Sequence, residues 1–367
     1  MMQSSLTVAS DDLIDLVGKI FSASGLSEPA ARKVAEALVE ADLEGLHSHG
    51  VMLVDMYVER MQRGSVSSKE SAEIISDRHG SVVLDAGNAL GHLTGEQAMA
   101  IAVLRARDFG TGVVAVRHGF HFGTARRYAL HAAAEGCVGI VMCNTRPLMP
   151  APGGAERAVG NNPVAIAIPT DGPSPIVLDM ATSEAAMGKI RMADKAKKTI
   201  PKTWAVTSDG APTTDPAEAI SGMLLPSGGP KGFGLAFVID LMCGLLSGGS
   251  HGNSVRPLYG DLSVTYDCSH LFIAIDVAHF CDLKWFRAQA ASAAEGIRSG
   301  RRAPGVSQLF SPGEPEWQKR ESAAGRVQLD PSVAEMLTRV ARRLGLSPKP
   351  WFANGNLDLQ GSGHAQA

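Results

Sequence analysis

The chain has 367 residues, of which 45% are hydrophobic, so it is long enough for two domains and a sizeable core. Its formal net charge is only −3 and no long basic run occurs, so neither nucleic acid nor an anionic membrane surface is an expected partner. The five cysteines form no C-x-x-C pair, which argues against a disulfide framework or a zinc knuckle. We therefore expect a globular protein of the reducing cytoplasm that acts on small molecules.

Two segments bear on secretion and membranes. The N-terminal residues lack the basic start and apolar core of a signal peptide, so secretion is not expected. The longest apolar segment, 232–246, carries Asp240 near its middle. It is shorter than the roughly 20 residues of a membrane span, so we interpret it as a buried helix and expect no transmembrane segment.

The first 64 residues are predicted to form three helices, the third over 48–63. On this helix His49, Leu53 and Tyr57 are spaced at i, i+4 and i+8, so they share one stripe. Because His49 falls in the first turn, the positive end of the helix dipole favours a neutral imidazole that can hydrogen-bond a ligand. The alternative is a core seam of Leu53, Tyr57 and Met61 with His49 at its edge.

A glycine pattern follows a predicted helix at 95–108, which Thr94 would cap. Gly110-x-Gly112-x-x-Ala115 matches the dinucleotide-binding fingerprint superficially. That fingerprint requires a strand before the glycines and a helix after them, and the order here is reversed. We therefore reject this match to the fingerprint.

The segment 117–128, R-H-G-F-H-F-G-T-A-R-R-Y, joins a predicted strand at 111–116 to a helix that Thr124 would cap. Such a junction is exposed while a strand and a helix hold it rigidly, so α/β enzymes often place chemistry there. His121 is therefore a candidate catalytic acid/base. The alternative is a capping or surface histidine.

Three further apolar runs, 137–142, 163–168 and 175–179, are predicted to be buried strands. Lys231 stands between glycines at the start of the apolar helix, where backbone N–H groups and the lysine could bind an anion such as a phosphate. The polar, glycine-rich tail at 351–367 is expected to be disordered.

Seven short motifs occur in one order along residues 10–345: S-H-G at 48–50, H-F-G at 121–123, G-N-N-P at 160–163, L-D-M-A-T-S at 178–183, P-T-T-D-P at 212–216, K-G-F-G-L at 231–235 and P-G-E-P-E at 312–316. In this order and spacing the chain resembles the malate/L-lactate dehydrogenase family of NAD(P)-dependent oxidoreductases, whose cofactor domain is not a Rossmann fold.

The resemblance implies an α/β fold with two domains. A non-Rossmann NAD(P)-binding α/β domain would cover 121–299, and a helical, dimerising, substrate-side domain would be built from both chain ends, 1–120 and 300–350. The implied protein is a homodimer that uses NAD or NADP to reduce a 2-oxo acid, a cyclic imino acid or a related C=O or C=N substrate.

The resemblance also implies site residues. His121 and His49 match the proton-transfer and substrate-binding histidines, without a choice between them for the proton donor. The substrate-side candidates are Tyr57, Leu53, Phe120 and Arg146. The cofactor-contacting candidates are Thr145, Asp179, Met180, Ala181, Lys231, Gly313, Glu314 and Pro315.

Two departures from the family pattern point to an unusual substrate. Leu53 stands where relatives acting on 2-oxo acids usually carry an arginine that pairs with the substrate carboxylate. Its absence would cost about 1.5–3 kcal/mol unless a neighbour substitutes, and the candidate substitutes are Arg117, Arg126 and Arg146. Phe120 and His118 replace more usual polar residues, which favours a bulkier or less charged substrate.

Two other functions remain open. A relative that has lost catalysis and acts as a binding protein would explain Leu53. A metalloenzyme could use His47-x-His49 and His118-x-x-His121, although no acidic residue lies within either short motif, and we expect no metal site.

Overall fold

The computed structural model describes residues 6–347 and divides into two compact units. Among the described residues, the helical unit comprises 6–59 and 319–347, and the α/β unit comprises 60–318. The predicted tail at 351–367 lies outside the described residues. The division near 59 differs from the predicted boundary at 120, because the strands between 73 and 119 pair into the sheet of the α/β unit.

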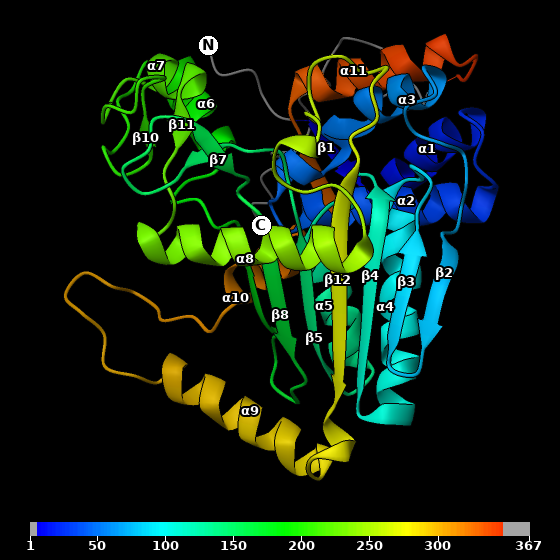
Figure 1. The fold of residues 1–367 in the computed structure, drawn as a ribbon, viewed down its shortest axis with the longest axis vertical. Coiled ribbons are helices and arrows are strands. Elements are labelled where there is room, and N and C mark those ends of the chain that lie inside the picture. The colour runs from blue at the N-terminus through cyan, green and yellow to red at the C-terminus, as the bar shows by residue number, and fades with distance from the viewer. Residues whose placement is uncertain (1–5, 348–367) are drawn as a thin grey trace, which may run out of the picture. The chain divides into compact units, whose positions relative to one another are not determined.

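The helical unit is built from both chain ends, as predicted. Its two strands, β1 (Leu6–Ala9) and β13 (Arg326–Leu329), pair antiparallel with Leu6 opposite Leu329. In Figure 1 the blue N-terminal helices and the orange-red α11 form this unit. Its other elements are α1 (Ser10–Ala23), α2 (Glu28–Leu43), the 3₁₀ turns η1 (His47–His49) and η2 (Val51–Leu53), most of α3 (Val54–Gln62), the second half of α10 (Glu314–Ala323) and α11 (Pro331–Arg343).

The single helix predicted over 48–63 is wrong. Gly50 adopts an extended backbone between η1 and η2, and the regular helix begins only at Val54. Because a 3₁₀ turn has about three residues per turn, the spacing of His49, Leu53 and Tyr57 no longer defines an α-helical stripe. His49 therefore does not sit in the first turn of α3, and the dipole argument for its neutrality fails.

The α/β unit contains one seven-stranded sheet, ordered β2 (Glu73–Arg78), β3 (Ser81–Asp85), β4 (Thr111–Gly119), β12 (Cys268–Asp276), β5 (Cys137–Cys143), β8 (Val164–Ile168) and β9 (Ile176–Met180). Only β3 and β4 pair in parallel, and all other neighbours are antiparallel. A Rossmann sheet is mostly parallel, so the expected non-Rossmann fold is confirmed. Gly110 closes a helix with a left-handed φ of 80°, and Gly112 lies inside β4.

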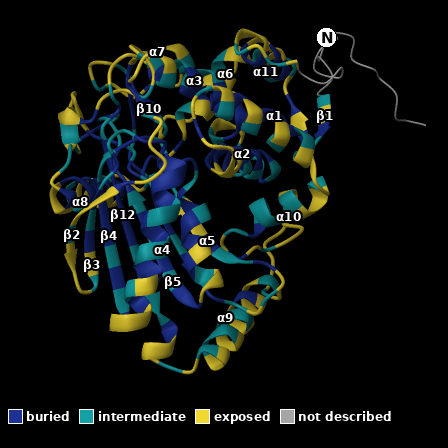
Figure 2. Cartoon of the chain, turned by 90° about the vertical axis from the view of Figure 1, so that its right-hand side faces the viewer, coloured by how far each residue is buried: buried dark blue, intermediate teal, exposed yellow. Residues whose placement is uncertain are grey.

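The sheet is covered on both faces. Helices α4 (Gly91–Phe109) and α5 (Ala125–Ala134) pack on one face, and α8 (Pro230–Ser247) crosses the other (Figure 1). Central strands covered in this way need nearly continuous apolar runs, and β12 reads C-S-H-L-F-I-A-I-D. Figure 2 shows the consequence, since β4 and β5 are largely buried. The helix predicted from Gly95 begins earlier, at Gly91, so Thr94 lies buried inside it and is not its cap.

Helix α8 is only partly the buried helix that was predicted. Ile239 and Cys243 pack against the sheet, while the opposite face exposes large apolar side chains. These exposed residues are Leu235, Phe237, Val238, Leu245 and Leu246. By length and composition α8 is the one helix in 6–347 that could cross a membrane, and 39% of it is buried inside the structure.

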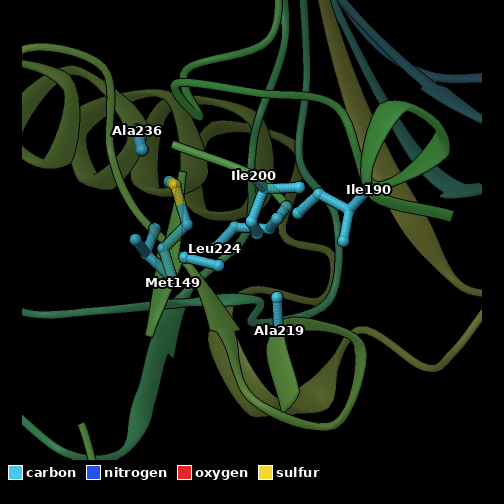
Figure 3. Packing of buried hydrophobic residues seen from close by; sticks show 8 residues of the cluster. Met149, Ile190, Ile200, Ala219, Leu224 and Ala236 are labelled. Atoms are coloured by element: carbon cyan, nitrogen blue, oxygen red, sulfur yellow. The ribbon is translucent and has the colours of Figure 1, made fainter. Parts of the chain in front are cut away.

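A small lobe lies outside the seven-stranded sheet and has two short two-stranded sheets of its own. Its elements are β6 (Met149–Pro150), β7 (Arg157–Val159), α6 (Met187–Lys195), β10 (Ala205–Val206), α7 (Pro216–Ser221) and β11 (Met223–Leu224). Met149, Ile190, Ile200 and Leu224 point toward one another in its core (Figure 3). Ala236 of α8 belongs to the same cluster, so the lobe fixes the start of α8.

The last elements of the α/β unit follow or flank β12. They are the 3₁₀ turns η3 (Gly252–Ser254) and η4 (Val277–His279), the helix α9 (Leu283–Arg298) and the first half of α10.

Candidate active site

His121 lies in the loop between β4 and α5, as the sequence predicted. The first turn of α4 holds this loop: a Cβ added to Gly91 would lie 2.2 Å from the carbonyl oxygen of Phe120 and 2.7 Å from that of His121. Only glycine therefore allows this approach. His121 is partly exposed, and its Nδ1 accepts a hydrogen bond from the backbone N–H of Gly123 at 3.4 Å. Thr124 precedes α5 but does not cap it with its side chain.

Asp85 anchors the residues just before His121. His118, at a left-handed φ of 48°, contacts the Asp85 carboxylate through Nδ1 at 2.9 Å, and Arg117 Nε donates to the same carboxylate at 3.0 Å. Burial raises the pKa of Asp85, but the hydrogen bonds from His118, Gly87 and Arg117 outweigh it and lower the pKa overall. Arg117 is thus engaged, which weakens its candidacy as the missing carboxylate partner.

Phe120 is buried against a fully buried arginine, Arg60, whose guanidinium lies 5.6 Å from the ring centroid. Arg60 Nη1 donates to the carbonyl of Val264 at 2.8 Å, and Nη2 donates to that of Leu258 at 2.7 Å. The ring of Tyr266 meets Phe120 edge-on at 6.0 Å. Arg60 therefore fastens the segment 257–266 next to the loop of His121. Sequence reasoning missed this role, because nothing in the sequence relates Arg60 to a segment about 200 residues later.

Thr145 is held where β5 ends. Its N–H donates to Asn162 Oδ1 at 2.8 Å, and its hydroxyl donates to Asn161 Oδ1 at 3.1 Å. The preceding Asn144 is fully buried and donates from Nδ2 to Asp240 Oδ1 of α8 at 3.0 Å. The two asparagines of G-N-N-P thus position Thr145, while Asn144 ties β5 to α8. Asn144 was not predicted, although its place directly after a buried strand was a usable signal.

Asp179 stands at the end of β9 and reaches the first turn of α5. Its Oδ2 accepts from the backbone N–H of Arg126 at 3.3 Å. The side chain is exposed, yet desolvation by the surrounding protein raises the pKa of Asp179 to about 6, against opposing effects of Arg126. Met180 and Ala181 follow, both partly exposed. The Arg126 guanidinium is buried and lies 3.5 Å from Glu316.

The start of α8 packs tightly onto the segment that follows β9. A Cβ on Gly232 would lie 2.3 Å from the carbonyl oxygen of Ser227 and 3.0 Å from that of Thr182, so this position requires glycine. Ser227 N–H donates to the Thr182 carbonyl at 2.9 Å. Lys231 is exposed in the first turn, and no side chain caps the helix at Gly229. Lys231 thus lies next to the uncapped start of α8, and anion binding there stays a prediction.

The segment 312–315 lies against β9. A Cβ on Gly313, which has a φ of +86°, would lie 2.4 Å from Val177 Cγ1. Val177 N–H donates to the Pro312 carbonyl at 3.0 Å. Glu314 is buried, and its Oε2 accepts from the N–H of Ser311 at 2.9 Å. This oxygen anchors the loop, and Pro315 follows it into α10.

The binding of a nicotinamide dinucleotide at the predicted cofactor positions stays a prediction. Thr145, Asp179 and Lys231 lie at the end of β5, the end of β9 and the start of α8, and the segment 313–315 lies against Val177 near the start of β9. Gly160 allows its backbone to lie against Thr145, because a Cβ at this position would lie 2.2 Å from Thr145 Oγ1. Thr182 Oγ1 is buried without a hydrogen-bond partner among the described residues, so the cluster leaves a polar group for a ligand to satisfy.

Arg146 is the remaining candidate for the missing carboxylate partner. It is partly exposed, and burial, followed by repulsion from Arg157 and Arg191, lowers its pKa. Arg157 is engaged with the Gly222 carbonyl at 2.8 Å, and Arg191 lies over the Tyr259 ring at 5.9 Å. The three guanidinium groups make this region electropositive, which favours a bound anion.

In the helical unit, Asp42 shapes the S-H-G turn that carries His49. The Asp42 carboxylate accepts from Val51 N–H at 2.8 Å and contacts His47 Nδ1 at 2.9 Å. A Cβ on Gly50 would lie 2.3 Å from this carboxylate, which explains the glycine. His49 Nδ1 contacts Ser48 Oγ at 3.0 Å. Asp42 was not predicted.

Burial lowers the pKa of His49, so a neutral imidazole at pH 7 is supported by desolvation, which replaces the helix-dipole argument. Leu53 and Tyr57 are buried, at 2% and 0% exposure, which favours the core alternative for both. The approach of His49 to His121 stays a prediction.

The histidine pairs of the metalloenzyme alternative are not grouped as ligands. His47 and His118 each contact a carboxylate, that of Asp42 and that of Asp85 respectively. Among residues 6–347, the ligand-type side chains that gather within metal-binding distance are Cys143, Cys268 and His270.

Comparison with known proteins agrees with the family resemblance of the sequence motifs. The sequence profile of a family described as malate/L-lactate dehydrogenase matches residues 8–338. A malate dehydrogenase of Pyrococcus abyssi is 34% identical over 353 residues, which cover 94% of this chain and 96% of that protein. An NAD(+)-dependent ureidoglycolate dehydrogenase of Escherichia coli O157:H7 is 34% identical over 319 residues, which cover 87% of this chain and 91% of that protein. The solved structure of sulfolactate dehydrogenase from Methanocaldococcus jannaschii superposes with a TM-score of 0.89 at 32% identity, covering 94% of this chain and 99% of that one.

Proposed function

Since the chain belongs to the malate/L-lactate dehydrogenase family and is an NAD(P)-dependent oxidoreductase, we propose that it reduces the C=O of a 2-oxo acid, the C=N of a cyclic imino acid, or a related group, with His121 as the proton donor. The reverse reaction would oxidise the corresponding hydroxy or amino acid, with His121 as the base.

One observation carries the assignment of His121. Asp179, a predicted cofactor contact, accepts a hydrogen bond from the second residue of α5, Arg126, and the loop that leads into α5 holds His121. The cofactor cluster and the catalytic candidate are therefore joined within one compact unit. A histidine on a surface loop far from α5 would not be linked in this way to Asp179.

The residues present suit the chemistry. The nicotinamide cofactor, when bound, supplies the hydride. Negative charge then builds on the oxygen or nitrogen of the substrate, and a group with a pKa near neutrality must deliver a proton there. His121 is partly exposed, so it can reach a substrate, and glycines fix its backbone. Lys231 and the uncapped start of α8 would hold anionic groups of the cofactor.

The substrate is proposed to be atypical for the family. Leu53 offers no charge, and of the three arginines considered as substitutes, Arg117 is engaged by Asp85 and Arg126 is buried near Glu316. Arg146 is thus the best-supported partner for a substrate carboxylate. His49, whose pKa burial lowers, keeps its predicted role as a neutral group that hydrogen-bonds the substrate.

We also propose a homodimer that uses the exposed apolar face of α8 in the α/β unit, and not the helical unit to which the resemblance assigned dimerisation. Five large apolar side chains of α8 are exposed. Single exposed apolar residues are common on protein surfaces, but several on one helix are typical of a protein–protein interface. The measurement is the mass in solution, with Leu246→Glu expected to shift a dimer to a monomer.

A panel of 2-oxo acids and cyclic imines, each offered with NADH and with NADPH, tests the proposed activity directly. We expect oxidation of the nicotinamide with at least one bulky or weakly charged member of the panel. Tight cofactor binding without turnover on any member would instead favour the non-catalytic binding protein that Leu53 raises as an alternative.

A further inference from the structure

Two cysteines and a histidine that are remote in sequence meet in the core of the α/β unit. In the pairing of β12 with β5, His270 lies directly opposite Cys143, and Cys268 lies two residues before His270 on the same strand. Alternate residues of a strand share a face, and directly opposed residues share it too. The pairing therefore brings all three side chains to one face of the sheet.

The ligand atoms of Cys143, Cys268 and His270 all lie within 4.8 Å of one another, and Cys268 Sγ is 3.2 Å from His270 Nε2. From this geometry we propose that the three side chains form a binding site for a thiophilic metal ion, Zn(II) or Cu(I). The proposal does not depend on the dehydrogenase activity, because none of the three residues belongs to the catalytic or cofactor set.

The spacing suits such an ion. Zn(II) binds thiolate sulfur at about 2.3 Å and imidazole nitrogen at about 2.0–2.1 Å, so two sulfurs on one ion are at most about 4.6 Å apart. The observed limit of 4.8 Å for all pairs requires shifts of only a few tenths of an ångström. Soft thiolate and imidazole ligands select these ions over Mg(II) or Ca(II).

The fold leaves room for His270 and orients it. A Cβ on Gly119 would lie 2.8 Å from His270 Cε1, so the glycine at the end of β4 provides the space for the imidazole. The ring of Phe122 stacks on His270 with centroids 4.5 Å apart and planes at 7°. Packing therefore fixes the ring plane, a task that an outer hydrogen bond performs in many metal sites.

The cluster is also incompletely satisfied as it stands. His270 is fully buried, and its Nδ1 has no hydrogen-bond partner among the described residues. Nε2, the nitrogen that contacts Cys268, would bind the ion, while Nδ1 on the other side of the ring would keep its buried position. Coordination of the ring to a cation would compensate its burial.

The net charge of the site favours the divalent ion Zn(II), whereas the presence of only three ligands favours the monovalent ion Cu(I). Zn(II) with two thiolates and a neutral imidazole carries no net charge, which suits a site where Cys268 and His270 are both 0% exposed. Binding would release the two thiol protons to solvent. Cu(I) would leave one negative charge, but it needs no fourth ligand. The two ions are distinguished by experiment.

The test uses the full chain, reduced and freed of metal, under anaerobic conditions. Zn(II) binding is followed by competition with a chromophoric chelator, Cu(I) binding by competition with a Cu(I)-specific chelator, and Co(II) serves as a spectroscopic probe of thiolate ligation. We expect one tightly bound equivalent per chain, sulfur-to-cobalt charge-transfer bands and a raised melting temperature, since a ligand that binds only the folded state stabilises it.

Variants assign the site. Cys268→Ala and His270→Phe, the latter keeping a ring to stack on Phe122, should each weaken binding more than about 100-fold, because even losing an outer partner costs 10–100-fold. Cys137→Ala is the matched control, since Cys137 is equally buried on β5 but lies opposite Asp276.

Far-ultraviolet circular dichroism verifies that each variant is folded. Unchanged affinity in both Cys268→Ala and His270→Phe, or the absence of a tight equivalent of either ion in the wild type, would overturn the proposal. Loss of the equivalent in Cys137→Ala as well would show that the metal binds elsewhere and would equally count against it.

Discussion

Asp179 combines an exposed side chain with a pKa raised to about 6, chiefly by desolvation. A carboxyl whose folded pKa exceeds its unfolded value near 3.8 contributes stability that is fully present below 3.8 and is lost as pH rises through about 6. At neutral pH the protein therefore maintains a partly desolvated carboxylate at a predicted cofactor contact. This is typical of functional sites, where binding takes precedence over stability.

Asp179→Asn should gain stability relative to the wild type as pH rises from 4 to 7, because the variant avoids the desolvated charge. The measurement is the difference in melting temperature between variant and wild type at the two pH values. The same variant should bind the cofactor more weakly at pH 7. An identical melting difference at both pH values would contradict this account of Asp179.

Arg146 carries the prediction about substrate charge. Arg146→Met should raise KM for a carboxylate substrate about 10–100-fold, the equivalent of losing a hydrogen bond between charged groups, and leave the dissociation constant of the cofactor unchanged. Arg157→Met is the control, because Arg157 is already engaged with the Gly222 carbonyl. Equal increases of KM in the two variants would show that the positive charge of the region as a whole binds the substrate, and would contradict a specific pairing of Arg146 with its carboxylate.

At the scale of elements, the cofactor cluster depends on glycines that let backbone segments touch. Gly313→Ala would place a methyl group 2.4 Å from Val177 Cγ1 at a φ of +86°. We expect a loss of about 1–3 kcal/mol from the backbone conformation alone, with the clash adding to it, and weaker cofactor binding because the loop must move off β9.

Gly305→Ala provides the matched control for Gly313→Ala. Gly305 has a similar φ of +80°, but nothing lies within 4 Å of the added Cβ. Its melting temperature should fall less, and its cofactor affinity should stay unchanged. Equal losses of affinity in both variants would mean that the contact with β9 does not position the loop. Thermal unfolding and a cofactor titration measure the two effects.

Elements with strong local signals could be predicted from the sequence. The apolar runs at 137–142, 163–168 and 175–179 are β5, β8 and β9, and the reversed order around Gly110 excluded the dinucleotide-binding fingerprint there. The 48–63 segment could not be predicted, because the carboxylate of Asp42 interrupts it from another helix. Helix propensities describe local sequence only, so they cannot predict a contact with a residue of another helix.

Within the site, the sequence predicted residues next to recognisable motifs and missed those that act across the fold. His121, Thr145, Asp179 and Lys231 lie in the elements where they were expected. Asn144 and Arg60 were missed, since their partners, Asp240 and Leu258, are remote in sequence. The cluster of Cys143, Cys268 and His270 was missed for the same reason, because only the pairing of β5 with β12 brings it together.

At the scale of the whole molecule, the two chain ends form one unit, and the α/β unit is the stretch of sequence between them. Leu337 of α11 is fully buried in the helical unit, so Leu337→Ala should cost about 2–5 kcal/mol. Because the units are compact separately, amide hydrogen exchange should accelerate in α1, α2 and α11 more than in β4 and β12. The control is Leu104→Ala, whose side chain is 57% exposed. Equal acceleration throughout both units would contradict the division.

We propose that the cofactor cluster and His121, joined through α5 and Asp179, carry out proton-coupled hydride transfer. The most direct test is single-turnover reduction of a substrate by the enzyme bound to reduced cofactor, in His121→Gln and in His118→Gln. We expect His121→Gln to slow nicotinamide oxidation about 100–10,000-fold, the usual contribution of a general acid, with cofactor affinity retained. His118→Gln should have a much smaller effect, because His118 contacts Asp85. An unchanged single-turnover rate in His121→Gln would contradict the account.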